Sequence, residues 1–500
     1  MFGLDDPIIK LSAILGSNAV QHKNKKQDEL KSADIEDSCH DNAEHRVYNA
    51  RWVTLALTSG SYFLSSWISY TIPTDDDILI KYFGVTEGAL TYALAYFLLG
   101  NSIGTFVEPY IESSLGLRKL YIFSASLLVL GMFWSVSAKH AFYGERIGMS
   151  IVGMSQGIVQ CPLAKICAIW FCPNGRTKAT TIALTMNNFG IGIAYVVPGL
   201  YWDGTIGFTR LREMLLGFSC LILVFTCLFM EESPPVAPSI SAELMQREMK
   251  ERPHSSNPIE FLFGFWWNAF SLFRVKGFFS IISISIGDVI VAYLTTVFLT
   301  ETLQADYEDN DFLRTMVGIG YYVPSVFVAS AAASLIDHFK TKHAEATYLT
   351  SLHSGCIMTI FSCGMILMAL YNSPEDSARN SFILYMVMLG NLMALLDGIS
   401  ADGAVEICYD CGFDGGHGIE NMVIALQMFL GNAISGLLMV GVPSNLMQSW
   451  LAPEYMAVYV ISTVVAVFMY IPLIGFRGKF KRVKMDMKIA PSGSTQRLLA

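Results

Sequence analysis

Long apolar segments follow one another along most of the chain and are separated by short polar loops. Each is about twenty residues long, the length that a helix needs to cross the roughly 30 Å hydrocarbon core of a bilayer. The pattern predicts twelve such helices, near residues 50–73, 88–107, 120–138, 147–171, 180–202, 213–230, 277–299, 315–336, 348–371, 381–400, 419–442 and 453–476. We therefore expect an all-α protein that crosses a lipid bilayer many times.

Polar stretches mark the ends and the middle of this pattern. The divider, residues 231–276, opens with "EESPPVAPS" and is too polar to bury a core of its own, so it predicts a cytosolic linker. It separates six predicted helices within residues 47–230 from six within residues 277–476. Residues 1–46, which lack the apolar stretch of a signal peptide, predict a disordered cytosolic tail, and residues 477–500 predict a basic cytosolic tail.

The end of the linker is itself apolar. The segment "FLFGFWWNAFSLF", Phe261–Phe273, is too short to cross a bilayer and is followed by Arg274 and Lys276. We interpret it as an amphipathic segment that lies in the membrane interface. The alternative interpretation is an early start of the seventh helix.

Basic residues in the short loops predict the orientation of the helices, because Lys and Arg concentrate in cytosolic loops. They follow the second, fourth, eighth and twelfth predicted helices, which places both termini in the cytosol. Two features depart from this rule. Arg210 and Arg212 stand together after the fifth predicted helix, and the loop "ADGAVEICYDCGFDGGHGIE" carries five acidic residues and no Lys or Arg.

Two of the predicted cytosolic turns share one pattern, in which a carboxylate at a helix end is followed by basic residues. The matching sets are Glu112, Arg118 and Lys119 after the second helix, and Asp337, Lys340 and Lys342 after the eighth. Such a repeat in two six-helix halves is typical of major facilitator transporters, and the charges can latch the cytosolic ends together as a gate. The alternative is ordinary contact of long side chains with the membrane interface.

Three further ionisable residues lie near predicted cytosolic helix ends. We interpret Glu108, Lys165 and Asp397 as gate or scaffold groups. Glu108 and Lys165 are candidates for an ion pair, and Asp397 is expected to cap the inner end of the tenth helix.

Composition supports a membrane protein and excludes other classes. Of the 500 residues, 53% are hydrophobic and only 15% are charged, and the net charge of −9 offers no basic surface for a nucleic acid. No nucleophile–base pair, phosphate-binding loop or dinucleotide fingerprint occurs in a fitting context, so we expect neither an enzyme nor a bound cofactor. Cys408 and Cys411, with His417, lack the second pair of ligands that a structural zinc site needs, so no metal site is expected.

One predicted helix carries a carboxylate in its interior. The segment "SISIGDVIVAYLTTVFL" contains Asp288 and, five residues later, Tyr293. An ionisable residue inside a bilayer is costly and indicates a functional site. Five helical residues turn through about 140°, so we expect Asp288 and Tyr293 on different faces and Asp288 outside any cage that Tyr293 builds. Asp288 then either faces a transport cavity deeper toward the cytosol, if Gly287 lets the helix bend, or pairs with a polar group on a neighbouring helix. Asp288 is a candidate for cation selectivity or for proton coupling.

Four blocks of the sequence resemble the feline leukaemia virus subgroup C receptor family of major facilitator transporters. They are "SSWISY", "QGIVQCPLAKICAIWFCPNGRTKATTIALTMNNFG", the helix with Tyr293, and "VEICYDCGFDGGHGIENMVIALQMFLGN", in the family's order and between residues of about 50 and 475. The residues that carry the resemblance are Trp67, Gln156, Lys165, Trp170, Phe171, Asn187, Gly190, Tyr293, Glu406, Tyr409 and Gln427. An acid at Asp288 departs from the family pattern.

The resemblance implies a central cavity and transport of choline or ethanolamine, with haem export as a further association. It implies that Trp67 and Tyr293 flank the substrate, since aromatic faces attract a quaternary ammonium ion, and that Gln156 and Gln427 supply amide oxygens. Asn187, and Gln160 one turn after Gln156, are expected to extend the polar lining. Lys165 and Glu406 join the expected cytosolic gate.

The sequence therefore predicts an alternating-access facilitator for a small organic cation, most consistent with choline or ethanolamine. Haem or another porphyrin is the alternative within transport, and a non-transporting receptor or sensor is the alternative of another class. We expect a monomer embedded in a lipid bilayer, with no nucleic acid partner. The plasma membrane is the favoured location, and an organelle membrane is the alternative.

Overall fold

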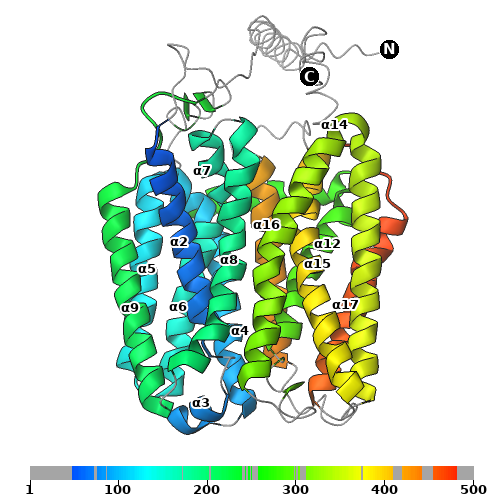
Figure 1. Ribbon diagram of the computed structural model, residues 1–500. Coiled ribbons are helices and arrows are strands. Elements are labelled where there is room, and N and C mark those ends of the chain that lie inside the picture. The colour runs from blue at the N-terminus through cyan, green and yellow to red at the C-terminus, as the bar shows by residue number, and fades with distance from the viewer. Residues whose placement is uncertain are drawn as a thin grey trace, which may run out of the picture.

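A computed structural model of the protein describes residues 48–480, with gaps. The residues outside the description are 73–75, 86, 172, 202–203, most of 239–256, 298, 300–301, 304–310, 373–375, 409–418 and 442–453, together with residues 1–47 and 481–500. The predicted tails therefore lie almost wholly outside the described residues. Within them the chain is nearly all helical, as the apolar pattern predicts (Figure 1).

The helices form two groups that lie side by side in Figure 1, here called the N-half and the C-half. The N-half comprises α2 (Ala50–Tyr70), α3 (Asp76–Phe83), α4 (Glu87–Leu115), α5 (Leu117–Ser137), α6 (Phe142–Gln160), α7 (Leu163–Trp170), α8 (Pro173–Tyr201) and α9 (Gly204–Phe229). The C-half comprises α12 (Phe278–Val297), α14 (Asp311–Tyr371), α15 (Asp376–Cys408), α16 (Ile419–Gly441) and α17 (Glu454–Ile474). Along the chain, the two halves are connected by a linker that contains α11 (Pro258–Ser271) and the short helix η1 (Leu272–Arg274).

Every predicted span overlaps a helix of the structure. The fourth span is divided between α6 and α7, and the eighth and ninth both fall in the 61 residues of α14. A straight helix of that length would measure about 90 Å, and Figure 1 shows α14 turning back on itself near its label. Among the described residues, nine helical stretches are long and apolar enough to cross a membrane. The count of twelve crossings and the cytosolic termini stay predictions.

Glycines bring α4 and α6 into very close contact. Gly100 and Gly104 on α4 interleave with Gly153 and Gly157 on α6, each pair four residues apart. A Cβ atom added to Gly153 would lie 2.0 Å from the carbonyl oxygen of Phe97, and one on Gly104 would lie 2.2 Å from that of Met154. Small residues at this spacing let membrane helices pack backbone to backbone. The crossing consequently fixes the position of the polar residues that α4 and α6 carry.

A buried ion pair joins α6 to α9. The Arg212 guanidinium pairs with Glu145 and donates to the hydroxyl of Ser135 at 2.6 Å. Both charged side chains are almost fully buried, and the Phe208 ring lies 5.2 Å from the guanidinium carbon. The sequence pattern treats Arg212 as a loop residue that violates the charge rule. That interpretation is wrong because Arg212 lies within α9 and its charge is neutralised inside the protein.

The apolar end of the linker forms α11, a helix of its own. Asn257 caps it by accepting from the amides of Ile259 and Glu260, and Gly277 ends the connection to α12 with a φ of 89°. The early start of the seventh helix is therefore not observed. Ile259, Phe263, Trp267 and Phe270 leave one apolar side of α11 exposed, which agrees with a position in the membrane interface.

The other side of α11 contacts both halves through Trp266. Its ring stacks on Phe106 of α4 with a centroid distance of 5.2 Å and lies 4.9 Å from the ring of Phe429 of α16. Its indole N–H donates to the carbonyl oxygen of Phe106 at 3.0 Å. One side chain of the linker thus bridges the N-half and the C-half.

We expect Glu145→Ala to destabilise the protein strongly, because it leaves the buried charge of Arg212 without its partner. Breaking a buried pair in this way costs about 3–5 kcal/mol. Thermal unfolding of the purified protein in detergent measures the effect. The matched control is Glu243→Ala, which breaks the exposed Arg247–Glu243 pair and should cost less than about 1 kcal/mol. Equal losses from the two variants would contradict the structural role of the buried pair.

Trp266→Ala should loosen the contact between α4 and α16, whereas Trp267→Ala should not. The neighbouring Trp267 is 59% exposed and stacks only within its own helix, on Phe263. Removing a packed tryptophan costs about 3 kcal/mol or more in a protein core, so amide exchange in both helices near the bridge should accelerate about tenfold or more. Hydrogen-exchange mass spectrometry measures this, and similar exchange in both variants would refute the bridge.

Candidate functional site

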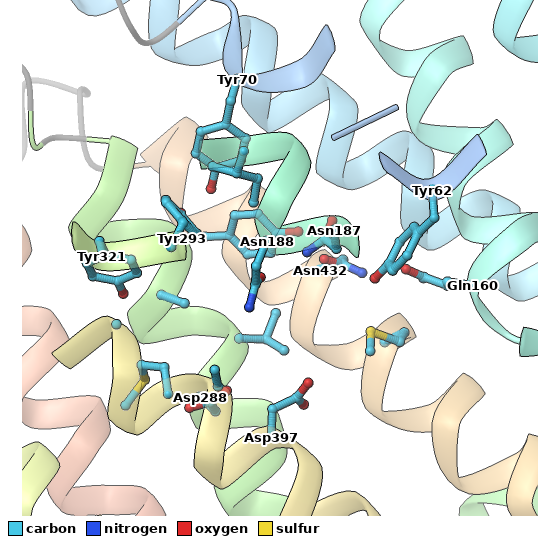
Figure 2. Close-up of a pocket in the computed structure, with 18 residues that line it drawn as sticks. Tyr62, Tyr70, Gln160, Asn187, Asn188, Asp288, Tyr293, Tyr321, Asp397 and Asn432 are labelled. Carbon is cyan, nitrogen blue, oxygen red and sulfur yellow. The ribbon is translucent and has the colours of Figure 1, made fainter. Parts of the chain in front are cut away.

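A cavity lies between the two halves. Side chains of α2, α6 and α8 line it from the N-half, and side chains of α12, α14, α15 and α16 line it from the C-half. The space between the lining atoms, including the part that is open to solvent, is about 670 Å³. Figure 2 shows its walls, with tyrosines toward one end and two aspartates at the other.

Tyrosine side chains form one end of the cavity. Tyr70 from α2 stacks on Tyr293 from α12 at a centroid distance of 6.4 Å and meets Tyr322 from α14 edge to face at 6.1 Å. The Tyr70 hydroxyl is 3.2 Å from the hydroxyl oxygen of Thr296, which ties α2 to α12. Tyr62 and Tyr321 also line the cavity. This end offers aromatic ring surface and phenolic oxygens from both halves.

Two carboxylates, Asp288 from α12 and Asp397 from α15, form the other end (Figure 2). The side-chain amide of Gln427 donates to Asp397 Oδ1 at 2.5 Å. Asp288 is only 4% exposed, and its Oδ1 atom has no hydrogen-bond donor among the described residues. The described lining contains no Lys, Arg or His. This end of the cavity therefore presents two acidic side chains, and no described lining residue is basic.

An amide network links the halves beside the cavity. Gln160 on α6 donates to Asn101 Oδ1 at 2.7 Å and to the Thr105 hydroxyl at 3.0 Å. Asn432 on α16 donates to the same Asn101 oxygen at 3.1 Å. The α4–α6 glycine crossing makes the two contacts of Gln160 with α4 possible, because it brings the two helix backbones together. The network positions Gln160 and Asn432 on the cavity wall.

The structure places three of the six predicted substrate residues on the cavity wall, Tyr293, Asn187 and Gln160, together with Asp288, the candidate for selectivity or proton coupling. Asp288 and Tyr293 were expected on different faces of the helix, with the cavity deeper toward the cytosol as one place for Asp288, and both line the cavity here, at opposite ends (Figure 2). The α12 residues at the cavity span an arc of about 140°, because the cavity wraps around more than a third of the helix circumference. Asp288 therefore belongs to the same site as the tyrosines.

The other three predicted substrate residues stand behind the wall. Gln156 donates to Asn187 Oδ1 at 3.0 Å and so holds an amide that does line the cavity. Gln427 similarly holds Asp397. The ring of Trp67 packs against Phe218 of α9 at 6.1 Å rather than facing the cavity.

Sequence reasoning missed Tyr70 and Asp397 as lining residues. Tyr70 lies three residues after Trp67, about 60° around the helix, and takes the position opposite Tyr293 that Trp67 was expected to fill. Asp397 does not cap a helix, because α15 continues for three turns to Cys408. An acid inside an apolar stretch was the available signal, as it was for Asp288.

The predicted gate is partly assembled beyond the carboxylate end. Lys165 of α7 forms a buried ion pair with Glu112 of α4, not with Glu108. Asn421 of α16 donates to the second oxygen of Glu112 at 3.5 Å, which adds a contact from the other half. Glu406 is buried near the end of α15.

The basic residues of the first turn do not join this ion pair. Arg118 is exposed and donates to the carbonyl oxygen of Cys227 on α9 at 3.2 Å, and Lys119 is also exposed. Both lie at the start of α5, on its outer surface. The backbone at Asp337 and Lys340 is part of α14, but their side chains lie outside the described residues, as do Tyr409, Cys411, His417 and most of the acidic loop.

Contacts between the halves exist on both sides of the cavity. On the tyrosine side, Tyr195 of α8 donates to the carbonyl oxygen of Thr296 at 3.1 Å, and Asn188 donates to Ser325 of α14 at 3.3 Å. On the gate side, Asn421 and Trp266 make the corresponding contacts. A change of access to either side requires one of these sets to separate.

Curated relatives of the chain are transporters. An uncharacterized MFS-type transporter of Caenorhabditis elegans is 23% identical over 79% of this chain and 66% of its own length. The choline/ethanolamine transporter flvcr2a of Danio rerio is 24% identical over 42% of this chain and 46% of its own length. Human choline/ethanolamine transporter FLVCR2 is 23% identical over 40% of each chain. The chain thus spans about two thirds of the first relative and less than half of the other two.

Solved transporters share the fold. The proton:xylose symporter XylE bound to 6-bromo-6-deoxy-D-glucose superposes with a TM-score of 0.61 at 16% identity, over 87% of this chain and 98% of that one. A partially occluded inward-open structure of XylE from E. coli gives a TM-score of 0.59 at 14% identity, over 86% of this chain and 100% of that one.

The sequence profile of the Major Facilitator Superfamily matches residues 54–408, well over half of the chain. The apolar helices, the two-part architecture and the cavity between the parts agree with that match. The chain belongs to the Major Facilitator Superfamily and is a multi-pass integral membrane transporter rather than an enzyme.

Proposed function

We propose that this transporter moves a small organic cation of the choline and ethanolamine class by alternating access. The observation that carries the proposal is the cavity itself, in which Asp288 and Asp397 face a tyrosine-rich wall and no described lining residue is basic. The site lies where the two halves meet, the usual place for a substrate in this fold.

Both ends of the cavity favour a cation. The ring faces of Tyr70 and Tyr293 attract a positive group by about 0.5–2 kcal/mol for each contact. The carboxylates add a direct charge interaction that is stronger in a buried cavity than in water. An anionic substrate would have to approach two buried negative charges without a described basic residue to balance them.

The relatives support this substrate class. Several are named choline/ethanolamine transporters, at identities between 20% and 24%. Asn187 and Tyr293, which the family resemblance implicated, lie on the cavity wall here, as does Gln160, which was expected from its position one turn after Gln156.

Haem is the less favoured substrate. Its propionate groups carry negative charge and would meet Asp288 and Asp397. Haem iron also needs an axial ligand such as a histidine. His353 of α14 does not line the cavity, because its ring lies beside Tyr470, with Nδ1 3.4 Å from the phenolic oxygen.

The alternative of a non-transporting receptor or sensor is also less favoured. Such a protein would not need a polar cavity with contacts between the halves on both of its sides.

Alternating access would break the contacts between the two halves on one side of the cavity at a time. Opening toward the gate side would separate Asn421 from Glu112 and Trp266 from one of its two partners. Opening toward the other side would break the bonds of Tyr70 and Tyr195 to Thr296. The two sets of contacts act in alternation, and the cavity with its carboxylates stays between them.

Asp288→Asn should weaken uptake of radiolabelled choline and ethanolamine while preserving the shape of the side chain. Loss of one buried charge interaction should raise the KM about tenfold or more, because charge-assisted contacts are worth about 1.5–3 kcal/mol. If the carboxylate provides selectivity, the KM rises at every pH. If it couples a proton, transport instead loses its pH dependence. Glu213→Gln, which neutralises an exposed acid on α9, is the control.

Tyr70→Ala and Tyr293→Ala should each reduce organic-cation uptake strongly, and Trp67→Ala should reduce it less. Tyr70→Phe keeps the aromatic face and should keep most of the uptake. Initial rates at equal surface expression give the comparison. A large loss in Trp67→Ala beside normal uptake in Tyr70→Ala would show that the substrate is held by the pair expected from the sequence.

A further inference from the structure

The two carboxylates of the cavity are not equivalent. Asp397 Oδ1 accepts the short hydrogen bond from Gln427, whereas Asp288 Oδ1 receives no donor from the described residues. Both side chains face the same end of the cavity in Figure 2, opposite Tyr70. A buried carboxylate oxygen without a donor is costly, so this atom is available for a ligand that brings one.

The chemical class of the ligand depends on which of its groups can donate a hydrogen bond to Asp288 Oδ1. A quaternary ammonium ion has charge but no N–H group, so choline can satisfy the tyrosine faces but can donate to the Asp288 oxygen only through its single hydroxyl. A protonated amine brings both the charge and N–H donors, and charge-assisted N–H contacts to a carboxylate are among the strong hydrogen bonds. Asp397 lies close enough to share the same end of the cavity and accept a second N–H.

We propose that Asp288 and Asp397 form a subsite for an ammonium group that retains N–H, so that the transporter prefers ethanolamine and related primary amines over choline. The proposal rests on the proposed transport of organic cations. Tyr70 and Tyr293 then cover the carbon atoms of the substrate, and the carboxylates determine which amines are accepted.

A methylation series tests the proposal. Ethanolamine, N-methylethanolamine, N,N-dimethylethanolamine and choline all carry one positive charge and one hydroxyl, and each step removes one N–H. Their KM values, or their potency as competitors of labelled ethanolamine uptake, should worsen along the series. The last step, which removes the final donor, should be the largest, about tenfold or more, because a site built to hydrogen-bond a group rejects the analogue that lacks it.

Variants identify the residue responsible. In Asp288→Asn the difference between ethanolamine and choline should shrink to a few-fold, whereas Asp288→Glu should keep the preference for ethanolamine. Glu213→Gln should leave the whole series unchanged. Ligand-dependent thermal shifts of purified protein give a second readout that does not depend on transport.

The outcomes separate the two proposals. Equal transport of all four amines, or a preference for choline, overturns the N–H subsite and leaves organic-cation transport standing. A difference between ethanolamine and choline that stays as large in Asp288→Asn as in the unmodified protein overturns the role of Asp288. If none of the four amines is transported or shifts the melting temperature, the proposed function fails, and the subsite fails with it.

Discussion

Polar groups inside a membrane-spanning bundle must find their partners within the protein, because the surrounding lipid offers none. This constraint organises most of the buried contacts in the structure. Arg212 is neutralised by Glu145, and Lys165 by Glu112. The amide of Gln160 is held by Asn101. These pairs join helices that are distant in the sequence, so satisfying them also determines which helices are neighbours.

Asp288 combines two features of this kind at the cavity. Its side chain is buried on the cavity wall, and its Oδ1 atom receives no donor from the described residues. Burying a carboxyl oxygen without a donor does not stabilise the fold. In the proposed function, a cationic substrate supplies the missing interaction, so that the cost of burying Asp288 is offset when substrate binds. The tyrosines at the other end of the cavity would then favour an organic cation over a small inorganic one.

The same polar contacts connect binding to conformational change. Asn421 reaches Glu112 across the interface on one side of the cavity, and Tyr195 reaches Thr296 on the other. Each is a modest interaction, worth about 0.5–1.5 kcal/mol, so either set can separate without unfolding a helix. The linker contributes as well, because Trp266 contacts helices of both halves and must release one when they part.

Sequence alone determined the helical membrane architecture and marked Asp288 as a candidate site residue, and its motifs showed the family likeness. The architecture follows from the length of the apolar segments and the choice of Asp288 from the cost of a charge in lipid, properties that each segment carries by itself. It did not determine that Tyr70 rather than Trp67 faces the cavity, that Gln427 serves another side chain, or that Lys165 pairs with Glu112. Those outcomes depend on how each helix is rotated and tilted against its neighbours. Close crossings such as that of α4 and α6 determine how each helix is rotated, and the sequence of a single helix does not contain this information.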